Sequence, residues 1–322
     1  MRFFFLIIAS LLFAQLVSAQ KLNQLKHEDH KEFFFHWDND VFLFTDFYYT
    51  QGVQLFYVNP ALRKNPANHF LPRLKNADNY FGIGLIQEIY TPKDITDSLM
   101  NLVDRPYAGT LFFRSFVTSV NPGKRLKLTS QLDLGFLGPL SGASHAQEII
   151  HDWLGSKPPM GWDFQVENRP YINYNLIIEK EFIQVPQLFS LLGNSQLRAG
   201  NIHNDLLVGT NFRFGRLNNY FKGLHLANKK YRENKDFEFY VCGGLNYREV
   251  LYDATLMGGI IPPKEDNQFK FNQIEHHILE YDIGVTITYK MLSLKGKVIW
   301  KTPEFENGES HGWGRISFYI RL

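Results

Sequence analysis

Cysteine is nearly absent from the sequence, and several common catalytic signatures are missing as well. Cys242 is the only cysteine, which excludes an intrachain disulfide and argues against a lipid-anchored form of the exported chain. Basic and acidic residues nearly balance, at 34 against 32, so no strongly basic stripe suggests a nucleic-acid partner. The sequence also has no Gly-x-Ser-x-Gly elbow, no HExxH motif and no phosphate-binding loop. These absences argue against the hydrolases and nucleotide-binding enzymes that such motifs define.

The one long apolar run, residues 3–13, lies at the N-terminus and is too short for a membrane-spanning helix. Arg2 precedes this run, and the small residues 17–19 follow it. The pattern predicts a signal peptide over residues 1–19. Residues 20–322 are then expected to form a single exported domain.

Aromatic residues make up 16% of the chain although its mean hydropathy is only −0.24, which suggests that apolar residues alternate with polar ones. Alternation is clearest in residues 281–289, 292–300 and 316–322, where polar and charged residues occupy the second face. Runs of about ten residues with aromatic tips are typical of an all-β, antiparallel up-and-down barrel of the outer membrane. The alternative is a soluble, secreted β-sandwich. Lysines gathered on one face and a final amphipathic strand favour the transmembrane barrel.

Six runs in the first half of the chain predict the order of the strands. They lie near residues 32–40, 50–58, 80–90, 108–120, 125–136 and 170–182. In an up-and-down barrel, the connections after the first, third and fifth of these strands fall at the same end. These connections are residues 41–49, 91–107 and 137–169, and the unusual motifs of the chain lie in them or at their edges. The sequence therefore predicts one composite site at this end.

The third of these connections predicts a short helix between two strands. Ser144 can cap the helix with Gln147 as its capping-box partner, and Gly155 can end it. Gln147 and His151 then lie one turn apart, on the flank of an apolar stripe. The stripe consists of Ala146, Ile149, Ile150, Trp153 and Leu154. A half-buried His151 favours its neutral form and can act as a general base, whereas the alternative is a packing histidine and a glutamine that serves only the cap.

The end of the first predicted strand, His36 to Asp40, groups several oxygen donors. Carboxylate and amide oxygens suit calcium or magnesium, so Asn39 and Asp40 are candidate ligands of a divalent cation. Neighbouring strand residues point to opposite faces, so both can reach one site only if the strand bends there. The alternative is a loop edge built from turn-forming residues.

Further polar candidates lie in the other connections. The hydroxyl of Thr50, in the motif TDFYYTQG, can hold a water molecule or a substrate carbonyl. Arg105, beside a proline, can bind a phosphate or simply pair with Asp104. Lys93 and Lys157 are further candidates for phosphate contact, although isolated lysines are more often only solvated.

Five motifs occur in order between residues 37 and 168: WDND, TDFYYTQG, DRPYAG, GPLSGASHAQEIIH and GWDFQVEN. Together they resemble the motifs of the lipid A 3'-O-deacylase family of outer-membrane enzymes. The resemblance implies a transmembrane barrel of about twelve strands, whose site opens at the cell surface under a short helix from an external loop. It also implies calcium-dependent hydrolysis of an acyl ester on lipid A. We therefore expect lipopolysaccharide and the outer-membrane bilayer as partners, and a monomer.

The resemblance also implies roles for individual residues. His151 would be the base that takes a proton from the attacking water. Asn39, Asp40 and Thr50 match other essential positions of the family: Asp40, with Asn39, would bind the cation, and Thr50 would position the water or the oxyanion. Gln147 matches a glutamine of the family's helix.

One departure from the family pattern concerns Lys157. Some members carry an active-site glutamate near the position of Ser156 and Lys157, so an ammonium group replaces a carboxylate here. We expect this exchange to lower the affinity for the cation or to change the substrate, with Glu167 as the candidate replacement. Two alternatives therefore stay open. One is a catalytically silent barrel that acts as a pore or surface scaffold, and the other is an esterase with Ser141 or Ser144 as nucleophile.

Overall fold

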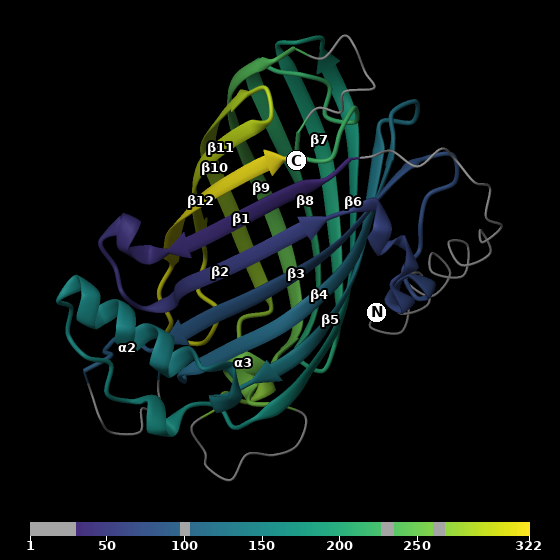
Figure 1. Cartoon of the computed structure of the whole chain (residues 1–322). Helices are drawn as coiled ribbons and strands as arrows, with labels where there is room; N and C mark the ends of the chain where they lie inside the picture. The colour runs from purple at the N-terminus through teal and green to yellow at the C-terminus, as the bar shows by residue number, and fades with distance from the viewer. Residues whose placement is uncertain (1–29, 97–103, 227–234, 260–267) are drawn as a thin grey trace.

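The computed structural model describes residues 30–96, 104–226, 235–259 and 268–322, and these form one closed barrel. The predicted signal peptide, residues 1–19, lies outside the described residues, as does the start of the exported domain. Twelve antiparallel strands follow sequence order around the wall, and β1 closes the sheet against β12 (Figure 1). This confirms the all-β up-and-down barrel and excludes the β-sandwich.

The strands are β1 (Glu32–Asn39), β2 (Tyr48–Val58), β3 (Asp78–Thr91), β4 (Ala108–Asn121), β5 (Leu126–Leu137), β6 (Arg169–Val185), β7 (Phe189–Gly200), β8 (His203–Arg216), β9 (Phe237–Asp253), β10 (His277–Tyr289), β11 (Leu292–Lys301) and β12 (His311–Arg321). The six strands predicted for the first half of the chain coincide with β1 to β6 apart from their ends. A bulge interrupts the register of β2 between Tyr49 and Gln51.

Short helices lie only in the connections of the described chain. They are the α-helices α2 (Ala143–Leu154) and α3 (Ala254–Met257), and the 3₁₀ turns η1 (Asp40–Leu43), η2 (Pro60–Lys64), η3 (Pro66–His69), η4 (Pro139–Ser141), η5 (Trp162–Phe164) and η6 (Phe271–Gln273). None of the described helices has the length and apolar character needed to cross a membrane.

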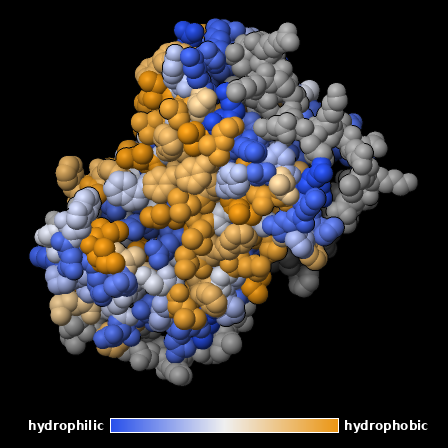
Figure 2. Space-filling view, in the orientation of Figure 1, coloured by the Kyte–Doolittle hydropathy of each residue, from blue (hydrophilic) through white to orange (hydrophobic). Residues whose placement is uncertain are grey.

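The outer face of the wall is apolar, as the alternating pattern predicts. On β10, the side chains of Tyr281 and Ile283 are 49% and 51% exposed, whereas Thr286 and Thr288 are buried in the lumen. Figure 2 shows hydrophobic side chains gathered in a band across the wall, with hydrophilic side chains toward the two ends. Such a band fits the hydrocarbon layer of an outer membrane.

The lumen is filled by side chains and by part of the connection between β8 and β9. The rings of Phe34 and Phe56 stack at 4.5 Å, and the fully buried Phe221 belongs to the same cluster. Lys127 Nζ donates to the carbonyl oxygen of Leu224 at 3.1 Å. Residues 217–226 are thereby fixed inside the barrel at the end where β1 begins, which we call the terminal end.

The connections after β1, β3 and β5 lie at the opposite end, beside α2 (Figure 1). This end, called the α2 end below, is where the sequence pattern places the unusual motifs. The meander predicted from the six runs is therefore confirmed.

Candidate active site

The chain bends at the end of β1, as a shared site for Asn39 and Asp40 requires. Asp38 faces the lumen, where Arg315 Nε donates to its Oδ1 at 2.5 Å, so Asn39 lies on the outer face. Asn39 then caps the 3₁₀ turn η1, because its Oδ1 accepts a hydrogen bond from the backbone N of Val41 at 2.8 Å. The turn takes Asp40 out of the strand alternation.

Asp40 is buried, and the connection that follows folds around its polar atoms. Its Oδ2 accepts a hydrogen bond from the backbone N of Phe47 at 2.8 Å, and its carbonyl oxygen accepts one from Thr45 Oγ1 at 3.2 Å. Burial raises the pKa of Asp40 to about 8, and the nearby carboxyl group of Asp46 adds to the rise. Among the described residues, Asp40 forms no ion pair that would oppose this effect.

His151 is only 7% exposed and points from α2 toward the connection after β1. Its Nδ1 lies 2.7 Å from the carbonyl oxygen of Lys157. Because a carbonyl oxygen can only accept, Nδ1 carries the proton, and the neutral imidazole keeps its lone pair on Nε2. Nε2 lies 3.6 Å from Oδ2 of Asp46. The basic nitrogen therefore faces the carboxyl group of Asp46.

The predicted capping box at the start of α2 is wrong. Gly142, at a φ of 66°, is the N-cap residue, and no side chain caps the helix. The 3₁₀ turn η4 leads directly into α2, so the helix begins at Ala143 and Ser144 already lies in its first turn. Gln147 is free of the cap: its Oε1 accepts from Trp162 Nε1 at 2.8 Å, and its buried Nε2 has no partner among the described residues.

The apolar stripe of α2 faces the barrel only in part: Ala146 packs against the cluster on the wall and Ile150 is half-buried, but Ile149 and Trp153 face outward. Ile149 and Trp153 are 55% and 81% exposed, whereas Ala143, Gln147 and His151 are buried; the side chain of Leu154 lies outside the described part. The close approach of the wall explains this, because a Cβ placed on Gly109 of β4 would lie 2.2 Å from Cβ of Ala143. Small and polar side chains fit this contact, and the large apolar ones are left facing the surroundings.

Thr50 lies on β2, next to the part of β3 that packs against α2. It is buried beside the bulge of β2, and its Oγ1 donates a long hydrogen bond, 3.4 Å, to the carbonyl oxygen of Ile89. The side chain of Ile89 is fully buried in a cluster with Ala143 of α2 and with Trp162. Thr50, Gln147 and His151 therefore belong to the region between the outer wall and the helix.

The three predicted phosphate-binding residues differ in their surroundings. Lys93 is half-exposed and pairs with Glu309, and the side chain of Lys157 is exposed. Arg105 is buried, and its Nη1 lies 2.6 Å from Oε2 of Glu304. Its backbone N donates to Oδ1 of Asp104 at 2.7 Å, so the predicted pair with Asp104 involves the backbone and not the guanidinium group. Its role here is to join two connections at the α2 end.

Glu167, the candidate replacement for the family's glutamate, forms an ion pair with another residue. Its Oε2 lies 3.0 Å from Nη2 of Arg169. The carboxylate that does contact His151 is that of Asp46, which lies in the motif TDFYYTQG and was not among the predicted site residues. The signal that could have identified it was topological, because Asp46 and His151 lie in connections predicted to share one end.

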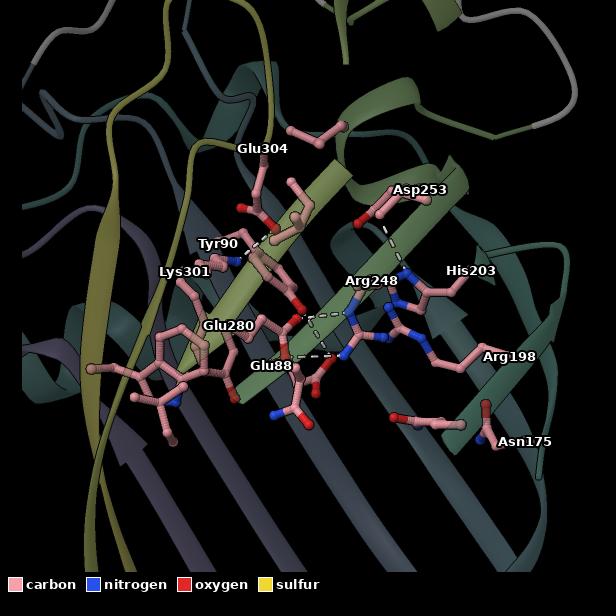
Figure 3. Close-up of a pocket in the computed structure, with 18 of the residues that line it drawn as sticks. Glu88, Tyr90, Asn175, Arg198, His203, Arg248, Asp253, Glu280, Lys301 and Glu304 are labelled. Atoms are coloured by element: carbon pink, nitrogen blue, oxygen red, sulfur yellow. Dashed lines mark hydrogen bonds and ion pairs between the residues drawn. The ribbon is translucent and has the colours of Figure 1, made fainter. Parts of the chain in front are cut away.

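The cavity in the lumen is distinct from this region. It measures about 390 Å³ and is lined by charged residues, and neither Asp40, Thr50, Gln147 nor His151 belongs to its lining. Figure 3 shows Arg248 and Glu280 pointing into this cavity, and their Nε and Oε1 atoms lie 2.7 Å apart. Several of its charged groups pair with one another in this way, including Arg114 with Asp133 and Arg198 with Asp205.

The region beside α2 offers hard oxygen donors for a cation. Asp40 and Asp46 supply carboxyl groups, and the amide oxygen of Asn39 already accepts one hydrogen bond. Within the described ranges, no three His, Cys, Asp or Glu side chains are grouped to hold a metal ion. Carboxyl groups are the donors that calcium prefers, and carbonyl and water oxygens would have to complete its shell at Asp40 and Asp46.

Comparison with known proteins agrees with the fold and the motifs. A family model described as outer membrane protein LpxR matches residues 5–322. The structure is similar to that of LpxR from Salmonella typhimurium, with a TM-score of 0.71 and 18% identity over 90% of this chain and 99% of that one. The β domain of the Bordetella autotransporter BrkA gives a TM-score of only 0.44, at 10% identity over 90% of this chain and 97% of that one. No curated protein matches the sequence.

The family match covers nearly the whole chain and does not depend on any single motif. It confirms the resemblance that the five motifs carry between residues 37 and 168. The chain belongs to the LpxR family of outer membrane proteins, the lipid A 3'-O-deacylase family that its motifs resemble.

Proposed function

We propose that this protein is an outer-membrane hydrolase that removes the ester-linked 3'-acyloxyacyl chain of lipid A. The observation that carries the proposal is the orientation of His151 between α2 and the barrel wall. Its Nδ1 is held by the carbonyl oxygen of Lys157 at 2.7 Å, and its Nε2 faces Asp46 at 3.6 Å. Family membership supports the lipid A substrate class.

In the proposed reaction, Nε2 of His151 takes a proton from a water molecule as this water attacks the ester carbonyl carbon. The bond between that carbon and the lipid A oxygen then breaks, and His151 returns the proton to the departing oxygen. The products are an acyloxyacyl acid and a free hydroxyl group on lipid A, so no covalent intermediate is needed. Ser141, the alternative nucleophile, is buried, and its Oγ accepts a hydrogen bond from the backbone N of Ala143 at 3.3 Å. This hydroxyl group therefore stabilises the start of α2.

We assign stabilisation of the negatively charged oxygen to Thr50 and Gln147. The amide Nε2 of Gln147 is buried and has no hydrogen-bond partner within the described chain. A buried donor of this kind gains stability when a substrate oxygen accepts from it, and the gain is largest when that oxygen becomes charged. Trp162 holds the other end of the amide, which fixes its orientation.

The proposal includes a divalent cation, calcium by ligand preference, at Asp40 with Asn39 and Asp46. When bound, such a cation supplies Lewis-acid stabilisation of the charge that develops on the ester oxygen. Burial raises the pKa of Asp40 to about 8, so without a cation its carboxyl group favours the protonated form. A bound cation would favour the ionised carboxylate instead.

The outer face of α2 suits a membrane substrate. Ile149 and Trp153 are exposed toward the surroundings of the barrel, where acyl chains would lie. Lys93 and Lys157 lie in the connections at the same end and are assigned to the phosphate groups of lipid A. The α2 end would then face the cell surface.

The proposal also includes a monomer. Because β1 closes against β12, the barrel has no open sheet edge that a second copy would need to cover.

The second candidate function is a silent barrel that acts as a pore or scaffold. The filled lumen disfavours the pore, since residues 217–226 and the Phe34 cluster occupy its terminal end. Planar-bilayer recordings should accordingly show no stable conductance. A scaffold would leave lipid A unchanged.

Mass spectrometry of lipid A from cells that express the protein tests the proposal. The wild type should remove one acyloxyacyl chain, His151→Ala should remove none, and Ser144→Ala should act like the wild type. Activity that survives in His151→Ala and disappears in Ser144→Ala would favour the serine esterase. Unchanged lipid A with folded wild type in the outer membrane would favour the silent barrel.

A further inference from the structure

Residues 59–77, the connection between β2 and β3, form a basic segment at the terminal end. The segment contains Arg63, Lys64, Arg73 and Lys75 and has neither aspartate nor glutamate. Arg63, Lys64 and Lys75 are exposed and, within the described part of the chain, pair with no carboxylate. Phe70 lies in the same segment and is 74% exposed.

The basic segment packs against the outer face of the wall. Leu71 is fully buried against Val117 of β4 and Phe81 of β3. Val117 follows Phe116, whose ring lies in the lumen cluster, so Val117 faces outward. Figure 1 shows this segment outside the barrel, beside the outer surface of the wall.

The segment covers polar side chains on the outer wall and forms hydrogen bonds with them that acyl chains could not provide. Ser130 Oγ donates to the carbonyl oxygen of Pro72 at 2.7 Å, and Asn65 Nδ2 donates to Ser115 Oγ at 3.1 Å. Farther along β5, the outward side chain of Leu134 is 48% exposed. The lipid-facing part of this wall therefore stops at the basic segment, which places the segment at the level of lipid head groups.

The short turns of the barrel identify the leaflet. Three of the connections at the terminal end are short turns, residues 122–125, 186–188 and 290–291, whereas the α2 end has one, residues 201–202, and carries the longest connection, residues 138–168. In outer-membrane barrels the short turns face the periplasm and the longer loops face the outside. The first of these turns extends the basic surface, because Asn121 Nδ2 donates to the carbonyl oxygen of Asn76 at 2.9 Å and Lys124 is exposed nearby. Head groups at this level belong to the phospholipids of the inner leaflet.

We infer that Arg63, Lys64, Lys75 and Lys124 form a docking surface for anionic phospholipid head groups, with Phe70 inserted among the acyl chains. Clustered basic side chains at a membrane surface attract anionic lipids, and an exposed aromatic ring at this level adds apolar contact. The surface lies at the end of the barrel opposite α2. It would operate whether or not the protein hydrolyses lipid A.

Native mass spectrometry of the purified full-length barrel in neutral detergent tests this inference. Equal amounts of phosphatidylglycerol and phosphatidylcholine are added, and the bound lipids are counted. The test variant is Arg63→Gln/Lys64→Gln/Lys75→Gln. The matched control, Arg216→Gln/Lys235→Gln/Lys290→Gln, removes one arginine and two lysines from the end of β8 and from two connections on the other side of the terminal end. Heat-modifiable migration on gels confirms that each variant is folded.

The wild type and the control should bind more phosphatidylglycerol than phosphatidylcholine. In the test variant the ratio of the two bound lipids should fall by at least about tenfold, because each basic residue near an anionic surface is expected to contribute about fivefold. Phe70→Ala should weaken the binding of both lipids and leave the preference intact. Equal loss in the control, or an unchanged preference in the test variant, would overturn the inference. So would full displacement of the lipid by an equal concentration of inorganic phosphate, because the surface would then bind phosphate without a membrane.

Discussion

Nδ1 of His151 lies 2.7 Å from the carbonyl oxygen of Lys157, the residue whose side chain departs from the family pattern. The contact uses only the backbone of Lys157, so the tautomer of the histidine does not depend on the side chain at that position. The ammonium group is exposed instead of inserted between His151 and Asp46. The departure therefore leaves the proposed base in place.

The first prediction concerns Lys157 itself. Lys157→Gln should keep kcat within about threefold of the wild type, because the ammonium group does not contact His151, while KM should rise because this group is assigned to a phosphate of lipid A. Purified variants can be compared by the release of acid from lipid A. A loss as large as that of His151→Ala would show that the ammonium group takes part in the reaction.

Asp46 is expected to matter more than its exposure suggests. Asp46→Asn removes the negative charge that faces His151 Nε2 at 3.6 Å and should reduce turnover by roughly tenfold to a hundredfold, the usual effect of losing a group that supports a catalytic or metal-binding residue. The variant should also need more calcium for half-maximal activity. Asp152→Asn, on the exposed side of α2, is the matched control and should behave like the wild type.

Gln147 provides a test of oxyanion binding. Gln147→Leu removes the unpartnered amide donor together with the acceptor of the Trp162 hydrogen bond, and kcat should fall by about a hundredfold while KM changes little. Trp162→Phe breaks the same hydrogen bond but leaves the donor of Gln147. If both variants lose activity equally, Gln147 acts only by holding Trp162.

The acid stability of the α2 end should depend on Glu304. Burial would raise the pKa of this carboxyl group, but Lys301 and Arg105 outweigh it and hold the pKa below its usual range. A carboxyl group of this kind stabilises the fold above its ordinary pKa, and this contribution is lost as the pH falls through the lowered value. Glu304→Gln should therefore lower Tm at pH 7 and flatten the decrease of Tm below about pH 4.5. Glu306→Gln, an exposed neighbour, should do neither, and a steeper acid decrease in Glu304→Gln would contradict this account.

The wall of the barrel was predictable because a transmembrane strand must alternate between lipid and lumen. The outward and inward residues of β10 follow this pattern, with Tyr281 exposed and Thr286 buried. The bend after β1 could be stated only as a condition, because strand alternation separates Asn39 from Asp40, and the turn η1 that removes Asp40 from the strand was not predicted.

The orientation of α2 could not be predicted from its own residues. An apolar stripe normally faces the protein, but a helix on the outside of a membrane barrel has lipid on its other side, so Ile149 and Trp153 are exposed.

The partners of Arg105 and His151 could not be predicted from the sequence for another reason. Glu304 lies far along the chain from Arg105, and Asp46 lies in another connection from His151, so each pair depends on how loops fold at the α2 end.

The most direct test of the central claim is the mass of lipid A after incubation with the purified barrel in detergent and calcium. The account predicts that the wild type removes the 3'-acyloxyacyl chain and that His151→Ala, folded and heat-modifiable, is slower by at least about a hundredfold. Lipid A of unchanged mass with the wild type, or equal cleavage by His151→Ala, would contradict it.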